Sequence, residues 1–225
     1  MRWPGYSPQG ATVARFLDFD GLVSGEQRTL AGNVSLLGTS PDGTLLALRV
    51  VSSQDGKASS DVTVVTSEDQ AEVRRWSVPE TTGFGMFANA GTAFCTQANL
   101  SQASSGQELI CHDIATGNVI LKRAFPHAGF GRIYATADTI LAPDEIVLRL
   151  PDEMDGDCIY CRRSMDLTDF QTGKRIAHWR VEEVRTSPRG QRTFFESTIS
   201  PAGDAVAIGG AGKLKIYRVA RRRPR

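Results

Sequence analysis

The sequence predicts an all-β protein built from repeated strand units, and the first sign is a turn that occurs twice. Ser-Pro-Asp-Gly stands at 40–43 and Ser-Pro-Ala-Gly at 200–203, each between two apolar runs. Proline fixes φ at the second position of such a turn, and glycine relieves strain at its end. The flanking runs are therefore expected to fold back on each other as β-hairpins.

A regular spacing of turn anchors is the second sign. The anchors are separated by 48, 47 and 65 positions and are Gly43, Gly91, Asp138 and Gly203. A Gly-Phe-Gly triplet keeps nearly the same spacing, because 83–85 recurs 46 positions later at 129–131. A period of 40 to 50 residues is typical of repeat architectures. We expect two regular repeats and one that carries an insertion.

The third sign lies where each unit should pass from its third strand through a turn to its outermost strand. Cys-His-Asp-Ile-Ala-Thr-Gly-Asn at 111–118 resembles the Trp-Asp-Leu-x-Thr-Gly-Lys segment of WD40 and related β-propeller blades, with His112 in place of the tryptophan. The segments 165–174 and 17–26 are longer versions of it. No Gly-His pair opens a repeat, so the chain resembles divergent WD40/YVTN-like propellers with Ser-Pro-Asp-Gly turns.

This resemblance implies a single β-propeller of about five four-stranded blades, either incomplete or part of a larger propeller. The expected repeats are 1–32, 33–80, 81–127, 128–183 and 184–219, followed by a basic, disordered tail at 220–225. The strands expected in the second repeat are 34–39, 44–51, 61–66 and 72–78, with a polar loop at 52–60. The last repeat ends after its third strand, so we expect either that residues Arg2–Tyr6 close the ring or that the chain pairs with further blades or a second copy.

Composition agrees with a soluble all-β domain and excludes some partners. The chain of 225 residues holds 22 glycines and 10 prolines and lacks an 18-residue apolar segment. A formal net charge of +1 gives no general attraction for nucleic acid or anionic lipid. Residues 1–6 contain no apolar signal region, so a cytoplasmic location is expected if the chain is complete.

The four cysteines are the number that a structural zinc site requires. Cys158 and Cys161 form a Cys-x-x-Cys, but positions i and i+3 of a strand face opposite sides. The spacing of Cys95 and Cys111 fits a cross-strand pair around a hairpin. Buried, unreactive thiols are the interpretation that we favour over metal or redox chemistry.

Two loops resemble ligand sites only superficially. The acidic segment 152–157 offers carboxylates beside Gly156, but it does not match the register of a calcium-binding EF-hand loop, and we expect a solvated insertion. The segment Gly209–Lys213 lacks the first glycine and the Ser or Thr of a phosphate loop and leads into a strand. It is expected to be a glycine-rich hairpin turn.

The remaining candidates are scattered. His112, His127 and His178 show no metal-ligand spacing, and no Gly-x-Ser-x-Gly nucleophile motif is present. The basic run 218–225 could touch phosphate, although a solubilising tail is favoured. We therefore expect no catalytic, cofactor-binding or metal-binding residues.

Two functions follow from these patterns. The favoured one is a non-catalytic binding or scaffold module that recognises a protein or peptide on one face or in the central channel. The alternative, which the propeller resemblance implies, is a hydrolase or quinoprotein-like propeller, or an accessory domain of one, with a polar site at the channel mouth. Convergent carboxylates, Arg and His there would favour the enzyme, and an apolar or aromatic patch would favour the binding module.

Overall fold

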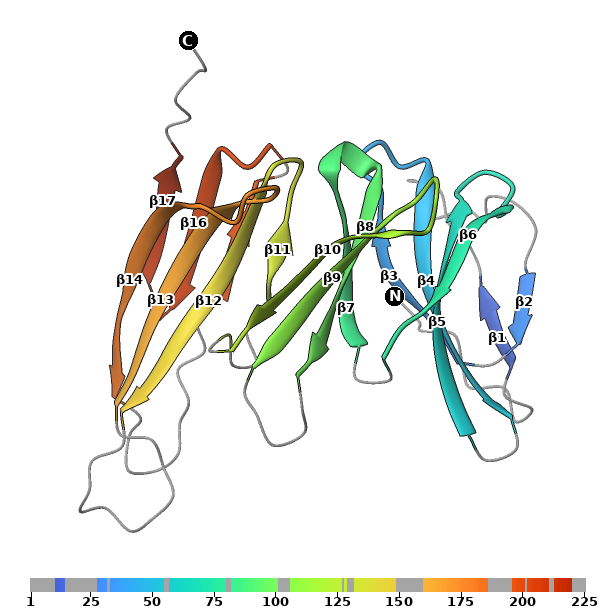
Figure 1. The fold of residues 1–225 in the computed structure, drawn as a ribbon, viewed down its shortest axis with the longest axis horizontal. Helices are drawn as coiled ribbons and strands as arrows, with labels where there is room; N and C mark the ends of the chain where they lie inside the picture. The colour runs from blue at the N-terminus through green and yellow to red at the C-terminus, as the bar shows by residue number, and fades with distance from the viewer. Residues whose placement is uncertain are drawn as a thin grey trace.

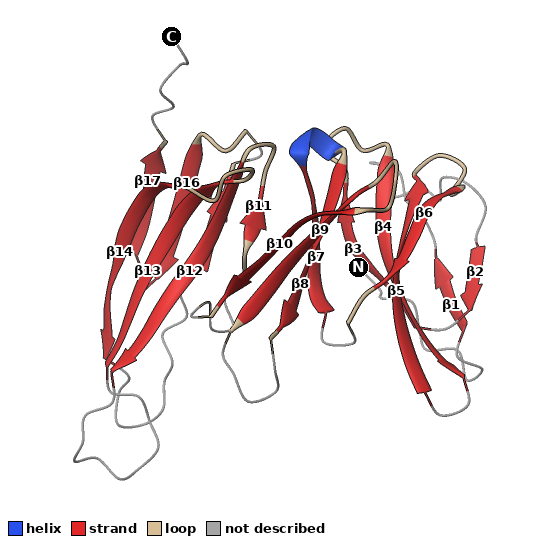
Figure 2. Ribbon diagram, in the orientation of Figure 1, coloured by secondary structure: helices blue, strands red, loops and turns tan. Residues whose placement is uncertain are grey.

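The computed structural model is a row of antiparallel β-sheets that follow one another along the chain (Figure 1). The residues that it describes are 11–14, 28–31, 33–54, 57–79, 82–100, 106–126, 128, 132–148, 160–185, 196–200, 202–210 and 213–219. Strands account for nearly all of the regular structure, and one short 3₁₀ turn, η1 (Asn89–Gly91), is the exception among these residues (Figure 2). None of the described residues belongs to a helix that could span a membrane.

Three of the sheets are four-stranded and one is three-stranded, and we name them blades I to IV. Blade I consists of β3 (Asn33–Thr39), β4 (Leu45–Gln54), β5 (Lys57–Thr66) and β6 (Glu72–Ser77). Blade II consists of β7 (Thr82–Ala88), β8 (Ala93–Asn99), β9 (Gln107–Asp113) and β10 (Val119–Phe125). Blade III consists of β11 (Tyr134–Ala135), β12 (Thr139–Leu148), β13 (Tyr160–Asp169) and β14 (Arg175–Arg185). Blade IV consists of β15 (Glu196–Ile199), β16 (Ala205–Gly210) and β17 (Lys213–Arg218).

The Ser-Pro-x-Gly turns join the first and second strands of blades I and IV, which confirms the predicted hairpins. Gly43 donates its N–H to the Ser40 carbonyl at 2.9 Å and has φ of +74°, a conformation that favours glycine. The Ser40 hydroxyl donates to Asp42 Oδ1 at 2.6 Å and accepts the N–H of Leu45 at 2.9 Å. Each turn thus satisfies its own backbone groups and returns the chain along the neighbouring strand.

The Asp-x-x-Thr-Gly segments form the turns between the third and fourth strands, also as predicted. Asp113 Oδ1 accepts hydrogen bonds from the backbone N–H of Thr116 at 2.7 Å and from its hydroxyl at 2.8 Å. Asp169 and Thr172 repeat this arrangement at 2.6 and 2.7 Å. These hydrogen bonds favour the ionised carboxylate, and they lower the pKa of both aspartates.

One hairpin differs from the prediction. The polar stretch 52–60 was expected to be a loop, but β4 extends to Gln54 and β5 begins at Lys57, with Ser53 opposite Ala58. Backbone pairing in an antiparallel hairpin does not require apolar side chains, so the ladder continues beyond the buried part of the sheet. The predicted loop was therefore wrong for most of its length.

The blades pack face to face through apolar clusters, as expected for a propeller. Val62 and Val64 of blade I meet Phe87 and Phe94 of blade II. The next two interfaces repeat this contact, with Leu109 against Ile140 between blades II and III, and Leu167 against Val206 between blades III and IV. Since such clusters bury residues on both faces of a sheet, the central strands are apolar without alternation.

Arginines add polar contacts across two of these interfaces. Arg74 on β6 donates from Nε to the Ile114 carbonyl at 3.3 Å and also contacts the Ala115 carbonyl. Arg123 on β10 donates to Thr168 Oγ1 at 3.3 Å and to the Phe170 carbonyl at 3.4 Å. In both cases the outermost strand of one blade holds a turn of the next blade.

The two ends of the row are not joined in the described residues. A separate two-stranded sheet of β1 (Ala11–Ala14) and β2 (Arg28–Ala31) lies beside blade I, whereas β17 forms the far edge of blade IV (Figure 1). Residues Arg2–Tyr6, the expected closing segment, lie outside the described residues, as do segment 17–26 and tail 220–225. The described part of the chain is therefore an incomplete β-propeller.

Candidate functional site

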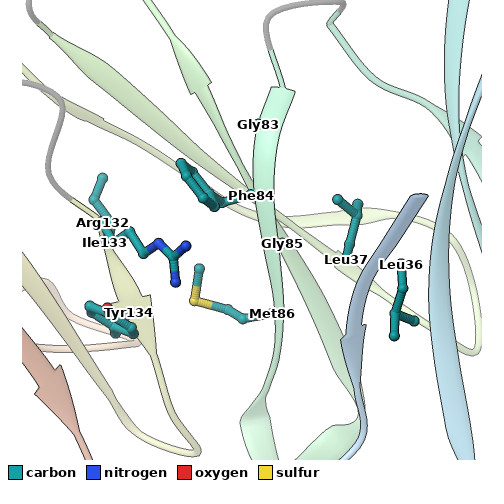
Figure 3. Close-up of a pocket in the computed structure, with 9 residues that line it drawn as sticks. All are labelled: Leu36, Leu37, Gly83, Phe84, Gly85, Met86, Arg132, Ile133 and Tyr134. Atoms are coloured by element: carbon teal, nitrogen blue, oxygen red, sulfur yellow. The ribbon is translucent and has the colours of Figure 1, made fainter. Parts of the chain in front are cut away.

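The candidate site is a hollow of about 320 Å³ between the innermost strands of blades I, II and III. Its lining comes from β3, from β7 and from the residues at the start of β11 (Figure 3). The lining residues are Leu36, Leu37, Gly83, Phe84, Gly85, Met86, Arg132, Ile133 and Tyr134. In a closed propeller, the first strand of each blade borders the central channel, so these strands occupy the positions that would line it.

Glycine allows these inner strands to approach one another. A Cβ on Gly85 would lie 2.5 Å from Cζ of Phe94 and 3.2 Å from Cβ of Leu37, so no side chain fits there. Gly38 on β3 faces this point, because a Cβ added to it would lie 3.6 Å from the Gly85 carbonyl oxygen. The Gly-Phe-Gly triplet that marked the repeat therefore has a packing role at its third residue, while Phe84 between the glycines is exposed to the hollow.

Hydrogen bonds between blades place the residues of blade III at the hollow. The backbone N–H of Ala135 donates to Met86 Sδ at 3.0 Å. The N–H of Ile133 donates to Gln97 Oε1 at 2.9 Å, and Gln97 is itself buried against Gln107. These contacts fix the short segment 132–135 against β7 and β8.

The chemistry of the hollow combines aromatic surface with one cation. The guanidinium carbon of Arg132 lies 4.5 Å from the centre of the Phe84 ring, which is a cation–π contact. Phe84 keeps 39% of its surface exposed and Leu36 keeps 60%. Figure 3 shows Phe84, Met86 and Tyr134 around the Arg132 side chain. In the described residues no carboxylate forms an ion pair with Arg132, so the site presents a positive charge over an apolar and aromatic floor.

The cysteine interpretation needs a correction. Cys95 on β8 and Cys111 on β9 are directly opposite in the sheet and are joined by a disulfide. Both are fully buried, as predicted, but they are not free thiols. Cys161 lies on β13, and Cys158 lies outside the described residues. Within the described part of the chain no three His, Cys, Asp or Glu side chains are grouped so that they could hold a metal ion.

The structure does not bring the described histidines together. His112 on β9 is buried and stacks on Trp76 with ring centres 4.8 Å apart, and burial lowers its pKa. His178 on β14 contacts Asp166 through Nδ1 at 2.6 Å. Both lie on the outer half of their blades and neither lines the hollow, while His127 lies outside the described residues.

The two loop candidates have different outcomes. Gly210 pairs with Lys213 across β16 and β17, so the strands on either side form the predicted hairpin, while residues 211 and 212 lie outside the described residues. The acidic segment 152–157 lies outside the described residues, so its solvated state stays a prediction.

Sequence reasoning missed the residues of the hollow itself. The Gly-Phe-Gly triplet was recognised as a repeat marker, and that signal could have singled out Phe84 as a channel residue. Arg132 and Tyr134 belong to no sequence motif. They line the hollow because blade III packs on blade II, which the sequence alone does not show.

No family model matches the sequence, and no curated protein matches it. Several solved structures resemble the fold. Hydrazine synthase from Kuenenia stuttgartiensis is 15% identical over 93% of this chain and 71% of its own, with a TM-score of 0.52. A prolyl endopeptidase is 11% identical over 84% of this chain and 27% of its own, with a TM-score of 0.53.

Acylaminoacyl peptidase from Pyrococcus horikoshii is 13% identical over 78% of this chain and 28% of its own, with a TM-score of 0.50. The chain thus spans less than a third of either peptidase. At such identities the likeness concerns the fold alone, and it supports the propeller architecture.

Proposed function

We propose that this propeller is a non-catalytic binding module that takes an apolar or aromatic side chain of a protein or peptide partner on its channel wall. The observation that carries the proposal is the lining of the hollow, where Phe84, Met86 and Tyr134 surround a cation. Clefts with mostly apolar walls and a few polar groups are typical ligand sites. In this site Arg132 is available to a carboxylate of the bound segment.

Short peptides test this proposal. The probes are Ala-Phe with a free carboxylate, Ala-Phe amide and Ala-Ala, and binding is followed by chemical-shift changes in the NMR spectrum of the chain. We expect Ala-Phe to bind most tightly, because it supplies both an aromatic ring and a negative charge. Phe84→Ala should weaken binding of both Phe peptides, and Arg132→Gln should remove only the preference for the free carboxylate.

A matched control distinguishes binding in the hollow from nonspecific binding of the peptides to exposed apolar side chains. Val73 on β6 keeps 38% of its surface exposed, close to Phe84, but lies outside the hollow. Val73→Ala should leave peptide binding unchanged. Equal weakening by Val73→Ala and Phe84→Ala, or no response to any peptide, would refute a channel-wall site.

The alternative, a hydrolase or quinoprotein-like propeller or an accessory domain of one, has less support from the described residues. The lining of the hollow contains no Asp, Glu, His, Ser or Cys that could act as nucleophile or general base. The peptidases named above contribute a likeness of fold only. Absence of turnover of chromogenic peptide esters by the purified chain is the expected result, and turnover would show that the chain is itself a hydrolase.

The repeat type and the compartment are also proposals. We infer WD40/YVTN-like repeats of a bacterial kind from the Ser-Pro-x-Gly and Asp-x-x-Thr-Gly turns. The buried disulfide favours an oxidising compartment over the cytoplasm, because disulfides persist mainly in oxidising surroundings. Peptide mapping after expression in a reducing and in an oxidising host compartment should find the Cys95–Cys111 bond, together with a higher soluble yield, in the second case.

A further inference from the structure

A buried histidine lies at the joint between blades I and II, by which we mean the packed interface of these two sheets. His112 on β9 is 8% exposed, and its ring stacks on the indole of Trp76 from β6, with ring centres 4.8 Å apart and ring planes 25° apart. Phe94, the β8 partner of His112, lies 6.3 Å from the same indole. Aromatic rings of both blades therefore surround one titratable group.

The imidazole of His112 is placed so that only its neutral form is satisfied. Its Nδ1 is buried and makes no hydrogen bond, and the same holds for Nε1 of Trp76. A neutral imidazole carries a proton on one nitrogen only, whereas the protonated ring carries a proton on both. Protonation would thus leave a charged, buried Nδ1–H donor without an acceptor, which costs more than the same defect in a neutral group.

The charged group that β6 directs toward blade II is a cation. Arg74 lies two residues before Trp76, and its Nε donates to the carbonyl of Ile114 at 3.3 Å. Ile114 follows His112 by two residues. A guanidinium at this point of the joint disfavours a second positive charge on the imidazole.

The carboxylates of the packed strands do not offset that charge at His112. β8 and β10 contain no acidic residue. The four acidic side chains of β5, β6 and β9 are exposed or have other partners: Glu72 is exposed at the start of β6, Asp61 pairs with Arg75, Glu108 pairs with Lys122, and Asp113 accepts the N–H of Thr116.

We propose that His112 makes the joint between blades I and II sensitive to mild acid, so that the two blades stay packed while the imidazole is neutral and loosen when it is protonated. Burial lowers the pKa of His112, in agreement with the geometry. A histidine whose pKa is lower in the folded state costs no stability above its unfolded pKa of about 6.5 and destabilises the fold as the pH falls below that value.

The hollow extends across the same joint. Leu36 and Leu37 of blade I and Phe84 and Met86 of blade II contribute to its lining. Loosening of the joint should separate these side chains, so acid should also weaken the binding of Ala-Phe. This second consequence rests on the proposed function, whereas the acid response of the joint does not.

Chemical denaturation of the parent and of His112→Phe at pH 8 and pH 5 tests the proposal. Phenylalanine keeps a ring against Trp76 and cannot take up a proton. The unfolding constant of the parent, relative to that of the variant, should rise by between about threefold and about thirtyfold from pH 8 to pH 5. The upper limit applies to a histidine that titrates near pH 6.5 in the unfolded chain only. An equal ratio at the two pH values would overturn the proposal.

The control is His178→Phe, at an exposed histidine on β14 that lies outside the joint. The unfolding constant of the parent relative to this variant should not rise in acid. A rise equal to that seen with His112→Phe would show that the response does not belong to the joint.

Hydrogen exchange of the parent tests the location without any variant. Protection is expressed relative to the free-peptide rate at each pH. It should fall between pH 7 and pH 5 for the amides of β6 and β9, and remain for those of β12 and β13 in blade III. An equal fall in both pairs would contradict a local joint.

Peptide binding at the two pH values distinguishes the joint from the hollow. We expect the parent to lose affinity for Ala-Phe at pH 5 and His112→Phe to keep it. If stability responds as expected but affinity does not change, the link between joint and hollow is wrong. If Ala-Phe binds at neither pH, the proposed function fails, and the stability result still decides whether the joint is acid-sensitive.

Discussion

Two glycines in this chain are required for different reasons. Gly43 adopts φ of +74°, but a Cβ placed on it would meet no atom within 4 Å. Gly85 has no unusual φ, yet its Cβ would collide with the Phe94 ring. The first requirement is conformational and the second is steric, so a turn motif can reveal the first while only tertiary packing reveals the second.

Gly43→Val should destabilise the fold by about 1–3 kcal/mol, because a β-branched residue is strained in the left-handed region. Nothing crowds the site, so the backbone alone accounts for the loss. Chemical denaturation measures the free energy of unfolding. Gly83→Ala is the control, since its Cβ would also meet nothing within 4 Å and its φ is not positive, and it should change stability little. Equal effects in the two variants would contradict the turn assignment.

The turn of blade I also predicts a response to acid. Hydrogen bonds, first from the Ser40 side chain and then from Thr44, lower the pKa of Asp42 from 3.8 to about 2. A carboxyl group whose pKa is lower in the folded state contributes stability above its unfolded pKa and loses it as the pH falls through the folded value. The contribution should therefore disappear between about pH 4 and about pH 2.

Asp42→Asn removes this titration and keeps an oxygen that accepts hydrogen bonds. The parent should be more stable than the variant near neutral pH, and the two melting temperatures should converge as the pH is lowered to about 2. Glu68→Gln, at an exposed carboxylate in the β5–β6 turn, serves as control. A constant difference between parent and Asp42→Asn across this range would refute the assignment.

At the scale of single residues, the turns could be predicted and the channel site could not. Ser-Pro-x-Gly and Asp-x-x-Thr-Gly determine local hydrogen bonds, which need only neighbours in sequence. Arg132 becomes a site residue because the Ile133 N–H reaches Gln97, 36 positions away. The Cys95–Cys111 bond lies between these cases, since the spacing indicated a cross-strand pair but not its oxidation.

At the scale of strands, the arginines at the blade edges are the contacts most open to test. Arg123 reaches the turn of blade III, where burial lowers its pKa and the nearby Asp169 opposes that shift. The guanidinium is cationic at any working pH. It therefore stabilises the carbonyl and hydroxyl groups of that turn as a permanent donor.

Arg123→Met should lower the free energy of unfolding by about 0.5–1.5 kcal/mol, because the hydrogen bonds are long and partly exposed to solvent. Thermal or chemical denaturation measures this. The control is Lys122→Met on the same strand, where Lys122 is 63% exposed and forms an ion pair with the half-buried Glu108 at 3.5 Å. It should cost less than about 0.5 kcal/mol. No loss of stability in Arg123→Met, or a loss no larger than that in Lys122→Met, would contradict a stabilising inter-blade contact.

The ends of a strand could be predicted only where its residues are buried and therefore apolar. The apolar run at 45–51 indicated β4, but its continuation through Ser52, Ser53 and Gln54 has no apolar signature. A hydrophobic pattern indicates which side chains are buried. Strand pairing that continues outside the core involves polar residues, so no such pattern indicates it. The hairpin of β4 and β5 is therefore longer than its sequence indicated.

At the scale of the whole molecule, stability should decline toward blade IV. Blades II and III are each packed on both faces, whereas blade IV is packed on one. In repeat proteins each unit is stabilised by its neighbours, so a unit with one uncovered face opens more readily.

Hydrogen exchange under native conditions should follow this order. The amides of β16 and β17 should exchange faster than those of β8 and β9, which lie between two packed faces and carry the disulfide. The measurement is made at low protein concentration, so that association does not protect the edge. Equal protection of the two pairs would mean that the described blades unfold as one unit despite the uncovered face.

The two exposed apolar residues on the third strand of blade IV have a consequence for the addition of blades to such a chain. A gene that duplicates its last repeat adds a blade whose predecessor already offers Leu214 and Ile216 as a docking surface. The added blade needs apolar side chains on the face that meets blade IV. Val206 and Ile208 provide such side chains on blade IV, and the duplication copies them. A blade added there by tandem duplication would therefore dock through apolar side chains that the repeat already carries on its two faces.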